Sequence, residues 1–198
     1  MQEKLPLWRK IIKDVLASLL TVLLLAAFYI AVVMGNPQKD DSSAASLQAD
    51  QPLPEAMSSP IMITQNSQLS ALLEFFPGQV MAAMNTSVLS LQHGLCEDVP
   101  FEAGLARRVT LTYRTGDGAA VTVVSIYPAR ATELIPKGDY TISGTAGLTL
   151  AGLRSVRMEN AATVRLHAQG KTALYIVTLP YRADLKSLTS TLQLYQGD

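Results

Sequence analysis

The feature that most constrains this chain is an uninterrupted apolar run near its start. Residues Val15–Met34 read VLASLLTVLLLAAFYIAVVM, and none of these side chains is charged. As a helix rising about 1.5 Å per residue, the run spans about 30 Å, the thickness of the hydrocarbon layer of a membrane. Lipid offers the backbone no hydrogen-bond partners, and a helix satisfies its own polar groups. The run therefore predicts one transmembrane helix, residues 15–34, in contact with membrane lipid.

The charges on either side of this run predict its orientation. Four basic residues precede it, whereas the first twenty residues after it contain only Lys39. The flank richer in Lys and Arg stays in the cytoplasm. We therefore expect a cytoplasmic basic tail, residues 1–14, and an extracytoplasmic C-terminal part in a single-pass protein of the cell membrane. A cleaved signal peptide has a similar start, with a shorter apolar region of about 7–15 residues. That alternative stays open beside the favoured retained signal-anchor.

A polar segment separates the apolar run from the rest of the chain. Residues 35–60 are rich in Ser, Ala, Pro, Asp and Gln and have no apolar periodicity. Such a composition predicts a flexible linker. Residues 61–198 are long enough to bury a hydrophobic core and are expected to form one extracytoplasmic domain.

Composition excludes several classes of function. Lys plus Arg equals Asp plus Glu, 16 of each, so no net field attracts nucleic acid, and we expect no nucleic-acid partner. The chain has one cysteine, Cys96, which excludes an internal disulfide and a multi-cysteine metal site.

Periodicity within residues 61–198 predicts a mixture of one short helix and several strands. Ser67–Phe76 places leucines at helical spacing, with Asn66 or Ser67 available as a cap. Arg108–Tyr113 and Val121–Tyr127 are β-rich runs separated by a turn sequence, Thr115–Gly118, which predicts a hairpin. Further short runs follow, each bounded by turn residues: Tyr140–Ser143, Leu148–Leu150, Leu153–Met158 and Thr163–His167.

The C-terminal part predicts a central strand and a helix that covers it. Ala173–Leu179 is apolar on both faces and forms a second hairpin with the preceding run. Leu185, Leu188, Leu192 and Tyr195 form one apolar stripe at helical spacing. The expected fold class is α+β: an N-terminal transmembrane helix plus a mainly antiparallel β-sheet domain with a short N-terminal helix and a C-terminal amphipathic helix.

Few residues are arranged for chemistry. His93 and Cys96 form H-x-x-C, but the remaining ligands of a zinc site, or the base of a nucleophilic cysteine, are missing, so Cys96 is expected to be buried. Glu97, Asp98 and Glu102 are interpreted as a solvated acidic loop. No catalytic, cofactor-binding or metal-binding residue is therefore assigned, and no cofactor is expected.

Basic residues and glycines give two further patterns. The basic sets could bind an anionic surface or be ordinary solvent-facing strand positions; they are Arg107, Arg108 and Arg114, and Arg154, Arg157 and Arg165. Gly144, Gly147 and Gly152 match no phosphate-binding motif and are interpreted as turn glycines. Asn85–Ser87 fits the short glycosylation triplet.

The layout of basic tail, span, linker and β-rich domain resembles the extracytoplasmic portions of bacterial single-pass membrane regulators, including anti-sigma-factor-like proteins. VRMENAATVRLHAQGKTALYIVTLP and the leucine stripe after it resemble the end of such domains. The sequence departs from that family before the span, where a sigma-binding domain or a His/Cys zinc signature is missing. The resemblance therefore implies the sensor half alone.

These observations favour a non-enzymatic, membrane-anchored binding or sensor domain whose partner is a protein or an envelope component. Two alternatives stay open: an envelope enzyme with an unrecognised active site, and a structural subunit of a membrane complex. A concave pocket with titratable groups of shifted pKa would favour the enzyme.

Overall fold

The structure, a computed structural model, describes residues 51–84, 87–144 and 149–197. These residues belong to one compact unit, Ser46–Asp198. The predicted tail, the predicted transmembrane helix and residues 35–50 of the predicted linker lie outside the described residues. Within the described ranges, no helix has the length and apolar composition needed to cross a membrane.

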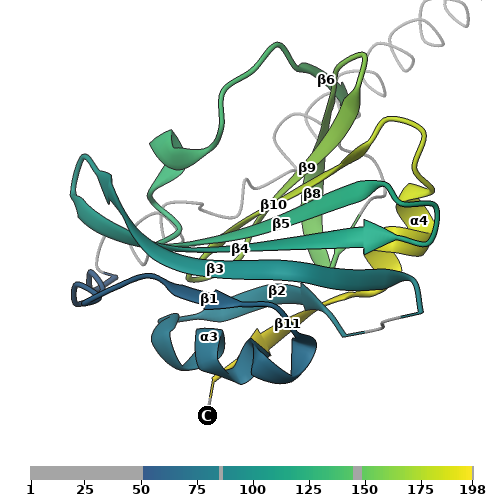
Figure 1. Cartoon of the computed structure of the whole chain (residues 1–198). Coiled ribbons are helices and arrows are strands. Elements are labelled where there is room, and N and C mark those ends of the chain that lie inside the picture. Colours follow the sequence, from purple (N-terminus) through teal and green to yellow (C-terminus); the bar gives the residue numbers. More distant parts are fainter. Residues whose placement is uncertain (1–50, 85–86, 145–148, 198) are drawn as a thin grey trace, which may run out of the picture. The chain divides into compact units, whose positions relative to one another are not determined.

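A large antiparallel sheet dominates the described part of the chain (Figure 1). Its strands follow the order β1-β3-β4-β5-β10-β9-β8-β6, and β7 adds to β8. The bounds are β1 Ile61–Ile63, β3 Leu89–Phe101, β4 Gly104–Thr115, β5 Ala120–Tyr127, β6 Thr141–Gly144, β7 Thr149–Leu150, β8 Leu153–Glu159, β9 Thr163–Gln169 and β10 Leu174–Pro180. The fold is thus α+β in the broad sense and rich in sheet, as predicted.

A second layer covers what we call the inner face of this sheet (Figure 1). It consists of strands β2, Gln79–Ala83, and β11, Leu192–Gln196, which pair antiparallel, and helix α3, Leu69–Phe75. Their side chains join the large sheet in the main hydrophobic core, which includes Leu72, Val80, Leu111, Val123 and Val177, none more than 1% exposed. The core thus lies between the two layers.

Among the described residues, one segment covers one end of the outer face of the sheet. We call residues 128–140 the arch; it contains a 3-10 helix, Thr132–Leu134, and passes over this face (Figure 1). Ala129 and Ala131 of the arch pack against Ile126, Leu174 and Ile176 in a second, smaller core. The rest of the outer face is half-exposed sheet.

Both predicted hairpins are confirmed. β4 and β5 pair in register from Arg107 with Tyr127 to Arg114 with Ala120, around a turn where Gly118 has φ +86°. β9 and β10 form the second hairpin. β10 is the central strand predicted from its apolar sequence, because it lies between β5 and β9 and contributes to both cores.

The predicted C-terminal helix is wrong in its second half. Helix α4 covers only Leu185–Ser190, and the chain continues as strand β11, which pairs with β2. Near the end of α4, the hydroxyls of Thr189, Ser190 and Thr191 donate to carbonyls three or four residues earlier, a pattern that weakens a helix slightly. The leucine stripe was apolar because Leu188 and Leu192 are both buried, in two different elements.

Two smaller predictions are corrected at the N-terminal helix and in the strands. The helix exists as α3, preceded by a 3-10 helix at Asn66–Gln68, and neither Asn66 nor Ser67 caps it. Gln68 Oε1 instead accepts from the backbone N–H groups of Thr64 and Gln65, just before the 3-10 helix. Strands β2 and β3 were not predicted. β3 carries Gly94 and Pro100, which are rare within strands.

One edge of β2 is buried against the large sheet, and side-chain hydroxyls there act as its partners. Tyr175 donates its hydroxyl to the Gln79 carbonyl at 2.9 Å. The Met81 N–H donates to Ser125 Oγ and the Ala83 N–H to the hydroxyl of Tyr113, both at 3.0 Å. Unpaired backbone groups cost free energy when buried, so these hydroxyls are what allow β2 to lie there.

The substitution Tyr113→Phe tests this role of the hydroxyls. It leaves the buried Ala83 N–H without an acceptor, so we expect the free energy of unfolding to fall by about 1–3 kcal/mol. Urea titration followed by circular dichroism measures this. The matched control is Tyr181→Phe, because Tyr181 is 48% exposed; a change below about 0.5 kcal/mol is expected there. Equal losses in both variants would contradict the role assigned to Tyr113.

Alkaline pH should destabilise the domain through the same tyrosines. Burial raises the pKa of Tyr113 and of Tyr175 to about 12, from about 10 in the unfolded chain. Below about pH 10 these tyrosines are protonated in both the folded and the unfolded chain, and the folded state keeps its full stability. As pH rises from about 10 toward about 12, the unfolded chain loses their protons more readily than the folded chain, so the free energy of unfolding falls. We expect urea midpoints to fall across that interval, and to fall less steeply with Phe at both positions. Ionisation of all tyrosines near pH 10 in the folded protein, seen by ultraviolet absorbance, would refute this.

Candidate functional site

Residues 51–59, which we call the strap, lie against the sheet domain. Gln51 Nε2 donates to the Lys171 carbonyl at 2.6 Å, and the hydroxyl of Tyr127 donates to the Pro52 carbonyl at 2.7 Å. This part of the predicted linker therefore packs on the domain. The strap leads into β1, the edge strand next to β3.

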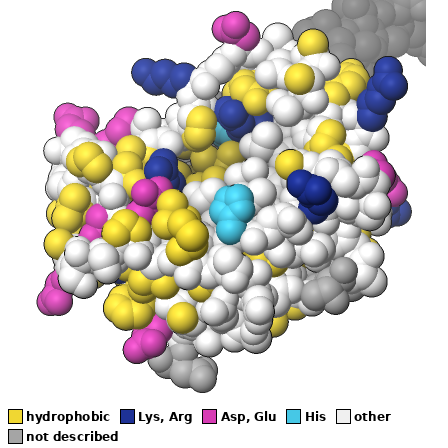
Figure 2. Space-filling view, viewed as in Figure 1, with side chains coloured by type: hydrophobic (Ala, Val, Ile, Leu, Met, Phe, Trp, Pro, Cys, Tyr) yellow, Lys and Arg dark blue, Asp and Glu magenta, His cyan; other side chains and the backbone are white. Residues whose placement is uncertain are grey.

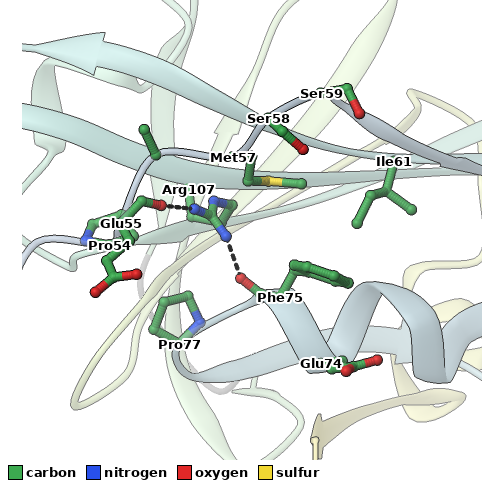
Figure 3. Close-up of a pocket in the computed structure, with 11 residues that line it drawn as sticks. Pro54, Glu55, Met57, Ser58, Ser59, Ile61, Glu74, Phe75, Pro77 and Arg107 are labelled. Atoms are coloured by element: carbon green, nitrogen blue, oxygen red, sulfur yellow. Dashed lines mark hydrogen bonds between the residues drawn. The ribbon is translucent and has the colours of Figure 1, made fainter.

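A buried arginine fastens the strap. Arg107 of β4 is 4% exposed, and its Nε donates to Asp98 Oδ1 of β3 at 2.6 Å. Its two terminal nitrogens donate to the carbonyls of Phe75, at the end of α3, and of Glu55 in the strap (Figure 3). Asp98 Oδ2 accepts from the Met57 N–H of the strap at 2.6 Å. One ion pair thus joins two strands, a helix end and the strap.

The hairpin register brings this ion pair together. β3 and β4 pair so that Asp98 lies opposite Arg107, and Glu97 opposite Arg108. Glu97 Oε1 accepts from Arg108 Nη2 at 2.6 Å, in a more exposed pair on the neighbouring row. The predicted acidic loop is therefore wrong for Glu97 and Asp98, which are strand residues paired with arginines. Glu102 alone is exposed in the connecting turn.

The strap, the end of α3 and the Arg107 guanidinium enclose an open cavity of about 610 Å³. Figure 3 shows Glu55 on the strap side and Glu74 on the helix side, with Phe75 and Pro77 between them. Phe75 is 45% exposed, so an aromatic ring faces the solvent at this opening. The remaining lining is apolar or neutral: Pro54, Ala56, Met57, Ser58, Ser59 and Ile61. The cavity combines apolar surface with carboxylates around it, a surface suited to binding.

The H-x-x-C pair is not a site. His93 is exposed and pairs with Thr112, whereas Cys96 pairs with Val109 and is fully buried, so the two side chains point to opposite faces of β3. Burial raises the pKa of the Cys96 thiol to about 11. The thiol is therefore protonated at neutral pH and fills space in the core, as predicted.

The remaining candidates lie apart from the cavity. Arg157 pairs with Glu159 at 2.7 Å, Arg165 is buried beneath the arch, and Arg114 and Arg154 are exposed, so the basic residues form no continuous strip in the described part. Gly152 has φ +83° in the β7–β8 turn, as predicted. Gly144, in contrast, ends strand β6. Gly147, Asn85 and Thr86 lie outside the described residues.

Comparison with known proteins adds no relative: no protein-family model, curated protein or solved structure matches this chain. The resemblance to anti-sigma-factor-like regulators stays an expectation from the sequence.

Sequence reasoning missed the Arg107 site, although a signal was present. A hairpin centred between Glu102 and Ala103 would place Glu97 opposite Arg108 and Asp98 opposite Arg107. Such opposite charges facing each other on neighbouring strands stabilise a pairing. The contacts to the strap had no signal, because on the strap side they are made by backbone groups, the Glu55 carbonyl and the Met57 N–H.

Replacing Asp98 should loosen the strap. In Asp98→Asn the Arg107 charge loses its buried counter-ion, and we expect the free energy of unfolding to fall by about 3 kcal/mol or more. Glu97→Gln, the control, breaks a pair whose side chains are 33% and 25% exposed, against 5% and 15% for Arg107 and Asp98, and should cost about 1 kcal/mol or less. Urea denaturation measures both. A loss in Glu97→Gln as large as that in Asp98→Asn would contradict the role of burial.

Proposed function

We propose that this chain is a membrane-anchored extracytoplasmic domain that binds a protein or an envelope component, without catalysing a reaction. The membrane anchor is the apolar run at residues 15–34, and the basic tail before it is cytoplasmic. The binding site is the cavity between the strap and helix α3. A ligand bound in this cavity changes how tightly the linker is held against the domain, so that the domain serves as a sensor.

The observation that carries this proposal is the dual position of the strap. Its residues, including Glu55 and Met57, form one wall of the cavity. The same segment is the C-terminal part of the predicted linker to the membrane, residues 35–60. A ligand seated in the cavity therefore contacts the chain that leads to the anchor, and it changes how tightly that chain is held.

The contacts that hold the strap suit such coupling. Arg107 bonds the carbonyls of Glu55 and Phe75, on the two sides of the cavity. A ligand that separates or draws together these sides acts on an ion pair that is shielded from water, where charge interactions are strong. Small displacements at the cavity then have a large energetic effect on the strap.

The distribution of shifted pKa values favours binding over catalysis. The thiol and phenols whose pKa is raised furthest belong to Cys96, Tyr113 and Tyr175, which lie in the main core. None of the three lines the cavity. An enzyme site would gather titratable groups of shifted pKa around its opening.

Photo-crosslinking tests the proposal with the full chain. Phe75 is replaced by benzoylphenylalanine, and isolated native membranes are irradiated. We expect a specific crosslinked adduct, identified by mass spectrometry, because the Phe75 ring lies at the opening of the cavity. Recovery of the chain in the membrane fraction, and its release when residues 15–34 are deleted, tests the anchor in the same preparation.

The matched control is the same replacement at Tyr181, which is 48% exposed against 45% for Phe75 and lies outside the cavity. We expect its adduct yield to be several-fold lower. Equal yields at the two positions, or no adduct at either, would overturn the proposed site. A chain found outside the membrane fraction would overturn the anchor.

A further inference from the structure

The cavity between the strap and α3 has carboxylates on two of its sides. Glu55 lies on the strap and Glu74 on α3, and both side chains are exposed (Figure 3). Neither carboxylate forms an ion pair with a basic residue in the described ranges. Two negative charges at one opening attract a positively charged occupant.

Arg107 is the basic residue among those that line the cavity, and it leaves these two charges uncompensated. Its Nε is paired with Asp98 Oδ1 at 2.6 Å, and its terminal nitrogens donate to the backbone carbonyls of Phe75 and Glu55. The guanidinium therefore has its counter-ion in Asp98, on the neighbouring strand. The carboxylates of Glu55 and Glu74 stay available to a cation from outside.

The distribution of charge around the cavity fits the same occupant. Figure 2 shows acidic side chains next to hydrophobic ones toward the lower left, where Figure 1 places the strap and α3. The exposed Lys and Arg side chains on this face lie mainly in its upper half. A basic partner that approaches the cavity from this side therefore meets little repulsion.

The rest of the lining suits the apolar part of a basic side chain. Phe75 is 45% exposed, and the face of an aromatic ring attracts cations. Met57, Ile61 and Pro77 add apolar surface, along which the alkyl stem of a lysine or arginine can lie while its charged end stays in water. The volume of about 610 Å³ lies within the range of about 300–1,000 Å³ that is common for ligand pockets.

We propose that this cavity binds a lysine or arginine side chain of a partner protein, together with an apolar residue beside it. The inference rests on the proposed function, because it takes the cavity as the binding site, and it adds the chemistry of the partner. The charged end lies between Glu55 and Glu74 against the ring of Phe75. The alkyl stem and the apolar neighbour lie along Met57 and Ile61. A purely apolar segment would take the carboxylates out of water without a partner, and a bare cation would leave the apolar lining unused.

A titration of the full chain tests this chemistry. The chain is held in dodecyl maltoside micelles with methyl labels on Met and Ile, and empty micelles serve as the blank. The probe is N-acetyl-Leu-Arg-Leu-amide, in which the guanidinium is the sole charge. We expect it to shift the methyl resonances of Met57 and Ile61. The same peptide with citrulline, which keeps the shape without the charge, should bind at least about tenfold more weakly. The Gly-Arg-Gly peptide, which lacks the apolar neighbours, should bind several-fold more weakly.

Three variants separate the roles of the lining residues. Glu55→Gln and Glu74→Gln change exposed side chains, so the urea midpoint should stay the same, while affinity for the Leu-Arg-Leu peptide falls about threefold to tenfold in each. Glu102→Gln is the matched control, because Glu102 is exposed and lies outside the cavity; no change beyond about twofold is expected. No methyl shift, equal binding of the citrulline peptide, or an equal loss in Glu102→Gln would overturn the inference.

Photo-crosslinking from position 75 distinguishes failure of this inference from failure of the proposed function. In native membranes, we expect the adduct yield to fall several-fold when Glu55 and Glu74 are both replaced by Gln. An adduct that forms at full yield in this double variant keeps the cavity as the binding site and overturns the recognition of a basic side chain. The absence of any adduct in the chain that retains both carboxylates overturns the site and the inference together.

Discussion

The buried edge of β2 sets the condition that the rest of this fold must meet. A strand whose second edge is removed from water needs partners for its backbone groups, and here no strand of the large sheet pairs with it in the described residues. Hydroxyls from β4, β5 and β10 meet this need at alternate residues of β2. Tyr113, Ser125 and Tyr175 supply these hydroxyls from the inner face of the large sheet, and their positions fix how the two layers stack.

Arg107 and Asp98 perform a comparable task at the periphery of the core, with charge instead of hydroxyls. The pair sits where a helix ends, where backbone carbonyls lack intrahelical partners, and Arg107 supplies a donor to one of them. The same guanidinium also bonds the Glu55 carbonyl of the strap, so it links the end of α3 to a segment that is distant in the sequence. The cost of burying the charge is offset only while all of these partners remain in place.

The sequence predicted those parts of the fold that depend on local periodicity. The β4–β5 and β9–β10 hairpins and helix α3 follow from alternating or helical spacing bounded by turn residues, and all three are confirmed. The prediction was wrong where apolar spacing fits two structures: Leu188 and Leu192 are four residues apart, as in a helix, but Leu192 is buried in a strand because β2 lies beside it. Pairing with a distant strand leaves no local signature.

The surroundings of the two buried arginines escaped prediction for a related physical reason. They depend on sheet register: Arg107 lies opposite Asp98 across one hairpin, and Arg165 lies opposite Thr178 across another. The first guanidinium has a carboxylate and backbone carbonyls, and the second has one carbonyl and an aromatic ring. Both arginines are buried, but only Arg107 has a carboxylate partner among the described residues. The Nε of the second is buried without a hydrogen-bond partner in the described part of the chain, which is uncommon for a polar group in a folded protein.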